Sequence, residues 1–183
     1  MPLVDGISRR QLEDRVRDVL KAADTLAGDS VFEPRDWPTD PKLFPIVLVQ
    51  APRERKEILY PGQPAFNTTI TMVVVGRVWG ATVEEANSRV NILAIQIEDA
   101  LLISPLIAEA VQQFISIETQ IAVSSQGGEQ IGEVGLSFEF SVYQAYGPDG
   151  PLLTDVMATL QPAPDPGPGQ PTPVVIDIKE NLP

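Results

Sequence analysis

The chain lacks two of the side chains that most often carry chemistry in proteins, cysteine and histidine. Without cysteine there is no disulfide framework and no thiolate site. Without histidine the chain has neither the commonest metal ligand nor the side chain best suited to acid–base work near neutral pH. We therefore expect no metal and no cofactor, and we expect that the protein is not an enzyme.

Long apolar runs are also missing. No uninterrupted run in the sequence approaches the roughly 18 residues that suggest a membrane span. The first residues lack a basic flank followed by an apolar stretch, so no signal peptide is visible. We expect a protein made in the cytoplasm, with no membrane partner. At 183 residues the chain suits one domain with its own core, plus an appendage.

Positive charge is scarce in the second half of the chain. Residues 1–77 hold 11 Lys/Arg and 11 Asp/Glu, whereas residues 78–183 hold only Arg89 and Lys179 against 14 acidic residues, which accounts for the net charge of −12. Binding to duplex nucleic acid depends on clustered Lys and Arg, which this half does not have. Its acidic surface either solubilises the protein, or repels a polyanion, or meets a basic partner.

The acidic residues do not form a catalytic pair. Glu84 and Glu85, like Glu98 and Asp99, are neighbours in a stretch that predicts a helix, where adjacent side chains point in different directions. The Gly127-Gly128 pair lacks the surrounding pattern of a phosphate-binding loop. These residues are better explained as solvated surface and as a turn.

The strongest structural signal runs from residue 66 to residue 102. Apolar residues alternate through residues 70–78, which predicts a strand with one fully apolar face. Gly80 ends that pattern, and Thr82 with Glu85 can cap the helix that follows. Five residues then share one helical stripe, at steps of four, three, four and four: Ala86, Val90, Leu93, Ile97 and Leu101.

Weaker patterns predict the remaining elements. Ser8 and Gln11 can cap an N-terminal helix, and Ser104-Pro105 can begin a shorter one that continues to about Phe114. Residues 46–49 form an apolar run typical of a buried strand, and residues 115–123 and 134–142 alternate as a hairpin. The predicted fold is α+β, a mostly antiparallel sheet of about four strands with two long helices and one short helix, plus an extended C-terminal arm.

Two segments have no local core to account for them. Residues 51–65 predict a loop, and its charged part would project from the sheet as a hairpin arm that is either solvated or touches a neighbouring subunit. Half of the 18 prolines follow residue 147, so we divide the chain into a ring-forming domain, 1–146, and a proline-rich linker and arm, 147–183. The β-prone run near the end is either a fluctuating terminus or a strand that joins a sheet edge. The predicted contact residues are Arg53, Arg55, Lys56, Glu57, Val174, Val175, Ile176 and Ile178.

The order of these elements resembles the tail terminator family of long-tailed bacteriophages and prophages. The resemblance covers roughly residues 8–146 and rests on the element order and on three stretches: Gly76-Arg77-Val78-Trp79-Gly80, Ala81-Thr82-Val83-Glu84-Glu85-Ala86 and Gln96-Ile97-Glu98-Asp99-Ala100-Leu101. It involves no catalytic motif, and residues 147–183 lie outside it.

The resemblance implies a structural virion protein of the tail or neck, assembled in the host cytoplasm. Six copies would form a ring that caps the tail tube, ends its polymerisation and joins the head connector or stopper protein. DNA would pass through the lumen without specific binding. Two other interpretations stay open: another neck or tail protein, such as a head–tail connector or tail tube subunit, and a non-viral soluble binding domain.

Overall fold

The computed structural model describes residues 3–33, 43–59, 61–62, 64–126, 129–147, 156–161 and 175–180. The chain divides into two compact units, Met1–Gly147 and Pro148–Pro183. The first unit is an α+β domain with one six-stranded sheet, and the second contains a separate two-stranded sheet.

The sheet of the first unit is built around its two longest strands, β4 (Ala65–Gly80) and β6 (Glu129–Tyr146), which pair antiparallel along their length. The strand β3 (Ile46–Ile58) pairs with the other side of β4. The opposite side of β6 pairs with β5 (Gln113–Gln126) and, at its end, with β1 (Leu3–Gly6). A two-residue strand, β2 (Val31–Phe32), pairs with β3 in the parallel direction.

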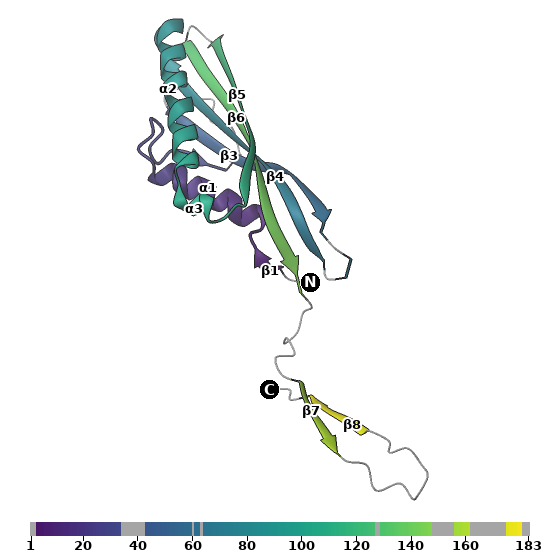
Figure 1. Ribbon diagram of the computed structural model, residues 1–183. Coiled ribbons are helices and arrows are strands. Elements are labelled where there is room, and N and C mark those ends of the chain that lie inside the picture. Colours follow the sequence, from purple (N-terminus) through teal and green to yellow (C-terminus); the bar gives the residue numbers. More distant parts are fainter. Residues whose placement is uncertain are drawn as a thin grey trace, which may run out of the picture. The chain divides into compact units, whose positions relative to one another are not determined.

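All three helices lie on one face of this sheet (Figure 1). The 14-residue helix α1 (Arg9–Ala22) begins with the predicted capping box, in which Ser8 and Gln11 exchange hydrogen bonds. The 20-residue helix α2 (Val83–Leu102) begins at Thr82, whose hydroxyl accepts the Glu85 N–H at 3.1 Å. A four-residue helix, α3 (Pro105–Ala108), follows. Both predicted helix starts are therefore confirmed.

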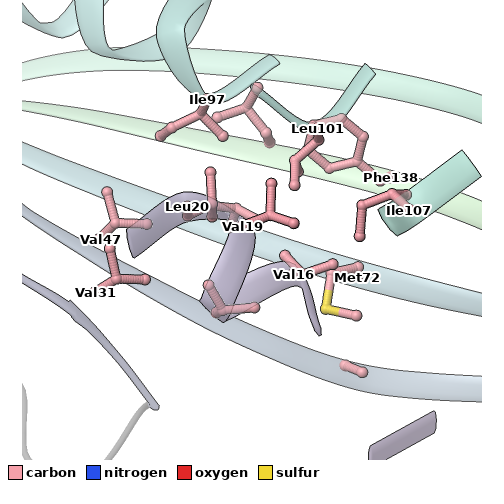
Figure 2. Close-up of a cluster of buried hydrophobic side chains, with 14 of the residues drawn as sticks. Val16, Val19, Leu20, Val31, Val47, Met72, Ile97, Leu101, Ile107 and Phe138 are labelled. Carbon is pink, nitrogen blue, oxygen red and sulfur yellow. The ribbon is translucent and has the colours of Figure 1, made fainter. Parts of the chain in front are cut away.

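The core fills the space between the helices and this face of the sheet. The even-numbered residues of β4 from Thr68 to Gly80 are all buried, as the alternation in the sequence predicts. Figure 2 shows Val16, Leu20, Met72, Ile97 and Phe138, from both long helices and from β4 and β6, in one cluster. Burying such side chains stabilises the fold by about 1.5–3 kcal/mol each. The packing of the helices against this one face of the sheet is therefore strongly favoured.

Glycines on the sheet let α2 approach it closely. A Cβ atom on Gly80 would lie 2.4 Å from the backbone nitrogen of Ala86, and one on Gly132 would lie 2.8 Å from the Ala86 carbonyl oxygen. A Cβ on Gly76 would lie 2.8 Å from Leu93 Cδ2. Because these distances are shorter than real Cβ contacts, any larger residue would push the helix away from the sheet.

The predicted sheet was too small. It has six strands rather than about four, and it is mostly antiparallel as predicted, but mixed because β2 runs parallel to β3. The short helix α3 ends at Ala108 instead of reaching about Phe114, and β5 already begins at Gln113. The residues before Ser8 include a strand, β1, that pairs with the end of β6. Short strands of this kind are fixed by long-range pairing, which leaves little trace in a local pattern.

Residues 51–58 are strand and not the predicted loop. They continue β3 and pair with β4 from Thr71 to Phe66. Consecutive charged residues suggested a loop, but here β4 supplies hydrogen-bond partners on one side while most of the β3 side chains stay in solvent. An edge strand tolerates charge in a way that a central strand does not.

The second unit contains β7 (Val156–Gln161) and β8 (Val175–Glu180), which pair antiparallel. Three of the predicted contact residues, Val175, Ile176 and Ile178, lie in β8, while Val174 lies outside the described residues. The predicted terminal strand therefore exists, and it pairs with β7.

Candidate assembly interface

The predicted contact residues on β3 lie on both faces of the sheet. Cross-strand pairing places Arg53 opposite Thr71 and Arg55 opposite Thr69 on the face without helices. A hollow of about 210 Å³ lies there, lined by Arg53, Arg55, Thr69, Thr71, Ile115 and Glu139. Arg53 and Arg55 are therefore available to a neighbouring molecule that covers this face.

Lys56 points to the opposite face and is held within its own subunit. It hydrogen-bonds the hydroxyl of Tyr146, its Nζ lies 4.7 Å from the centre of that ring, and it pairs with Glu54 at 3.4 Å. Burial lowers the pKa of Lys56, but the hydrogen bond with Tyr146 and the charge of Glu54 outweigh it, so the pKa is raised overall. We expect Lys56 to hold β3 to the end of β6 across the intervening β4. Its contact with a neighbour stays an untested prediction.

A polar network connects this part of the sheet to the N-terminal strand. Gln144 is fully buried, and its amide nitrogen donates to the Ile7 carbonyl oxygen at 2.7 Å and to Glu54 at 3.3 Å. The hydroxyl of Thr68 donates to the Gln144 side-chain oxygen at 3.1 Å. Because buried polar groups are costly when unpaired, this satisfied network fixes the positions of β1 and β3 relative to β6.

The face of the sheet without helices carries both polar and apolar side chains. On β4 it presents Thr69, Thr71, Val73, Val75, Arg77 and Trp79, all of intermediate exposure. Arg77 pairs with Glu133 across the β4–β6 pair at 2.6 Å, and the Ser116 hydroxyl bonds Glu139 at 3.0 Å. Charges of both signs meet on this face, so the net negative charge of the second half is not concentrated there.

Negative charge gathers instead around the outer side of α2. Glu84, Glu85, Glu98 and Asp99 lie on this helix against the single cation Arg89, which pairs with Glu85 at 3.7 Å. Arg89 also donates to the Trp79 carbonyl oxygen at 2.8 Å, which ties the start of the helix to the end of β4. The acidic residues at the start of α2 favour its helix dipole.

The same helix carries a second apolar surface that the sequence analysis missed. Ile95 is 60% exposed and Ile103, just beyond the helix end, is 79% exposed, while Ile92, Leu102 and Leu106 are also exposed. The spacing of Ile92, Ile95 and Leu102 by three and seven residues was the available signal. It was overlooked because the stripe beginning at Ala86 already explained the helix.

In the part of the chain that the structure describes, both lateral edges of the sheet lack a paired strand along most of their length. Beyond its pairing with β6, no described strand joins the outer side of β5. On β3 the described pairing with β2 involves only Val47 and Leu48. Exposed strand edges carry unpaired N–H and C=O groups, which makes them natural sites for pairing with another chain.

The described part of the chain also bears on metal sites and membrane spans. Among the residues that the structure describes, no group of three or more His, Cys, Asp or Glu side chains is placed to hold a metal ion. None of the helices in that part is both long and apolar enough to cross a membrane.

Comparison with known proteins finds a distant likeness among solved structures. No family model matches the chain, and no curated protein matches it. Among solved structures, a chain in the virion of a native gene transfer agent (GTA) particle is similar with a TM-score of 0.43 and 15% sequence identity, over 74% of this chain and 93% of that chain. A likeness of this size assigns the chain to no family.

Proposed function

We propose that the protein is a structural component of a phage-like virion, and specifically a tail terminator whose copies form a closed ring. In this proposal the ring, a hexamer, caps the tail tube, ends its polymerisation and joins the head connector. The chain acts as an assembly protein without catalytic activity. DNA passes through the lumen, and the scarcity of Lys and Arg after residue 77 would keep it from adhering there.

The observation that carries the proposal is the asymmetry of the sheet. Helices cover one face, while the other face and two lateral edges remain exposed in the described part of the chain. A contact in which one copy offers the outer edge of β5 and the next copy offers a different surface would be head-to-tail. Contacts of this type generate rings when the rotation closes and filaments when it does not.

The resemblance described above gives the ring its role. The strand–turn–helix unit on which it rests is present, since β4 ends at Gly80 and α2 begins at Val83 behind the Thr82 cap. A head–tail connector or a tail tube subunit remains the second candidate, because such proteins also form rings. A tube subunit differs in one measurable property, since its rings stack into long polymers.

The first experiment is the solution mass of the purified full chain, by light scattering, followed by negative-stain imaging. A hexamer of the 19.9 kDa chain would have a mass of about 119 kDa. Closed six-membered rings with a central hole support the terminator. Long tubes would replace it with the tube subunit.

A second experiment covers the case in which the ring forms only on its target. The full chain is mixed with isolated tail tubes, and imaging shows whether it binds at one tube end and stops further growth. A chain that is monomeric alone and also leaves tubes uncapped would refute the proposal.

A further inference from the structure

The outer edge of β5 is the less protected of the two sheet edges. Its sequence, residues 113–126, contains no Lys, Arg, Pro or Gly. Ile121 is 39% exposed, and Ile115 is 46% exposed beside a bulge that interrupts the pairing with β6. Natural edge strands are normally kept from pairing by charge, proline or a cover. Here a 14-residue strand has a single charged residue, Glu118.

The edge of β3 is protected by comparison. Pro52, which cannot donate a backbone hydrogen bond, lies within the irregularity between Gln50 and Arg53. Five consecutive charged residues follow, residues 53–57. These are the devices that discourage edge pairing, so β5 is the edge better suited to accept an added strand.

The terminal hairpin is a sheet of only two strands. Its register places Ala158 opposite Ile178 and Leu160 opposite Ile176. A two-stranded sheet is only marginally stable in water, and independent stability normally takes a third strand or a packing partner. The 13 residues between β7 and β8 include six prolines, and this connection is far longer than the loops that fix ordinary hairpins.

The connection to the hairpin is long enough to reach another molecule. Eight residues separate Gly147 from Val156, so the chain can span about 30 Å between them. That is about twice the radius of gyration of a domain of this size, which is roughly 15 Å. Next to Gly147, the side of β6 that carries β5 is already paired with β1.

We propose that β8 of one copy adds to the outer edge of β5 of a second copy, which extends the six-stranded sheet by the β7–β8 hairpin. The donor is the backbone of residues 175–180, and the acceptor is the backbone edge of residues 116–126. The inference rests on the self-association in the proposed function. It does not require that the protein caps a phage tail. It gives the terminal segment the role of a strand exchanged between neighbours.

The test uses the natural absence of cysteine. Full-length chains carrying Thr119→Cys on β5 are mixed with full-length chains carrying Asp177→Cys on β8, and a short bis-maleimide is added. The expected result is a cross-linked dimer on a denaturing gel. The matched control replaces Thr119→Cys by Asp18→Cys, at an exposed position on α1, and should give severalfold less dimer.

A second pair of variants tests the edge itself. Ile121→Lys places a charge on the β5 edge and should reduce the cross-linked dimer severalfold, whereas Ile95→Lys, at an exposed position on α2, should leave it unchanged. Circular dichroism checks that both variants fold. Equal cross-linking from the Asp18→Cys control, or an insensitive Ile121→Lys variant, would overturn the proposal.

The chain carrying both Thr119→Cys and Asp177→Cys decides between the two possible acceptors. Cross-linking only within one chain, with no dimer, would also overturn the proposal, because β8 would then pair with its own β5. Rings without cross-linking would reject this inference and leave the proposed function standing. Cross-linked open chains without rings would support this inference and reject the closed ring of the proposed function.

Discussion

The contact between Gly76 and Leu93 offers a quantitative test of how α2 lies on the sheet. Leu93 is fully buried, and a Cβ atom on Gly76 would meet its Cδ2 at 2.8 Å and Val134 Cγ1 at 3.0 Å. Gly76→Ala should therefore overpack the core and destabilise the fold by about 1–3 kcal/mol. Leu93→Ala leaves a cavity and should cost about 2–5 kcal/mol.

The two changes should compensate each other when combined. In the double variant the methyl group introduced by Gly76→Ala enters the space that Leu93→Ala vacates. The total loss should therefore be smaller than the sum of the single losses by about 1–2 kcal/mol. Urea denaturation of all four proteins, with a common slope, gives the coupling free energy.

Gly135→Ala is the matched control for this cycle. Gly135 also lies in the sheet, but a Cβ atom there would meet nothing within 4 Å. The substitution should be neutral or stabilise by about 0.4–1 kcal/mol, and it should be additive with Leu93→Ala. A Gly76–Leu93 coupling below about 0.5 kcal/mol would refute the placement of α2 over Gly76.

Three further predictions concern the helices and the β3 edge. The hydrogen bond from Arg10 lowers the pKa of Glu33 below its ordinary value of 4.5. The stability that Glu33 adds is therefore complete above pH 4.5 and is lost as the pH falls through the lowered pKa. The difference in unfolding midpoint between wild type and Glu33→Gln should therefore shrink in acid, and a constant difference would contradict the ion pair. Thr82→Ala should cost about 1 kcal/mol in urea denaturation through loss of the α2 cap, with Thr82→Ser as the control that keeps most of it. Arg53→Glu should weaken self-association, measured by light scattering, without changing the unfolding midpoint. Lys56→Ala should instead lower the unfolding midpoint. The opposite pattern would exchange the roles of the two residues.

The central unit of the fold was predictable because several local signals agree there. The alternation in β4, the break at Gly80, the Thr82 cap and the stripe from Ala86 to Leu101 all lie within one continuous stretch. Each signal depends on spacing along the chain, which the sequence displays directly. The α+β class and both long helices follow from such signals and are confirmed.

The extent of β3 was not predictable in the same way. Its charged half forms a strand because β4 lies beside it, and no pattern within residues 51–58 encodes that neighbour. The strand β1 was not predicted for the same reason, and Val31-Phe32 can be read as a short strand but its pairing with β3 cannot, since each of these strands is held by a few pairs to a distant strand. Strand preference depends on tertiary context more than helix preference does.

The candidate interface was only partly visible in the sequence. Residues 53–57 were singled out for their charge, but the division into Arg53 and Arg55 on one face and Lys56 on the other depends on their register with β4. The role of Lys56 depends on Tyr146, which is 90 residues away. The exposed edge of β5 could not be inferred, because an edge is defined by which strands are absent beside it.

The position of β6 in the sheet has a consequence for how the protein folds. This strand lies between β4 and β5 but is the last of the first unit to be synthesised, so the sheet cannot be completed until residue 146 has left the ribosome. Until then the nascent chain holds β4 with one edge unpaired, and many of the missing contacts are distant in sequence. We expect slow folding for a domain of this size and a need for chaperone protection during translation. The order of synthesis also limits premature association of incomplete copies. The outer side of β5 can act as a sheet edge only after β6 has paired with β5.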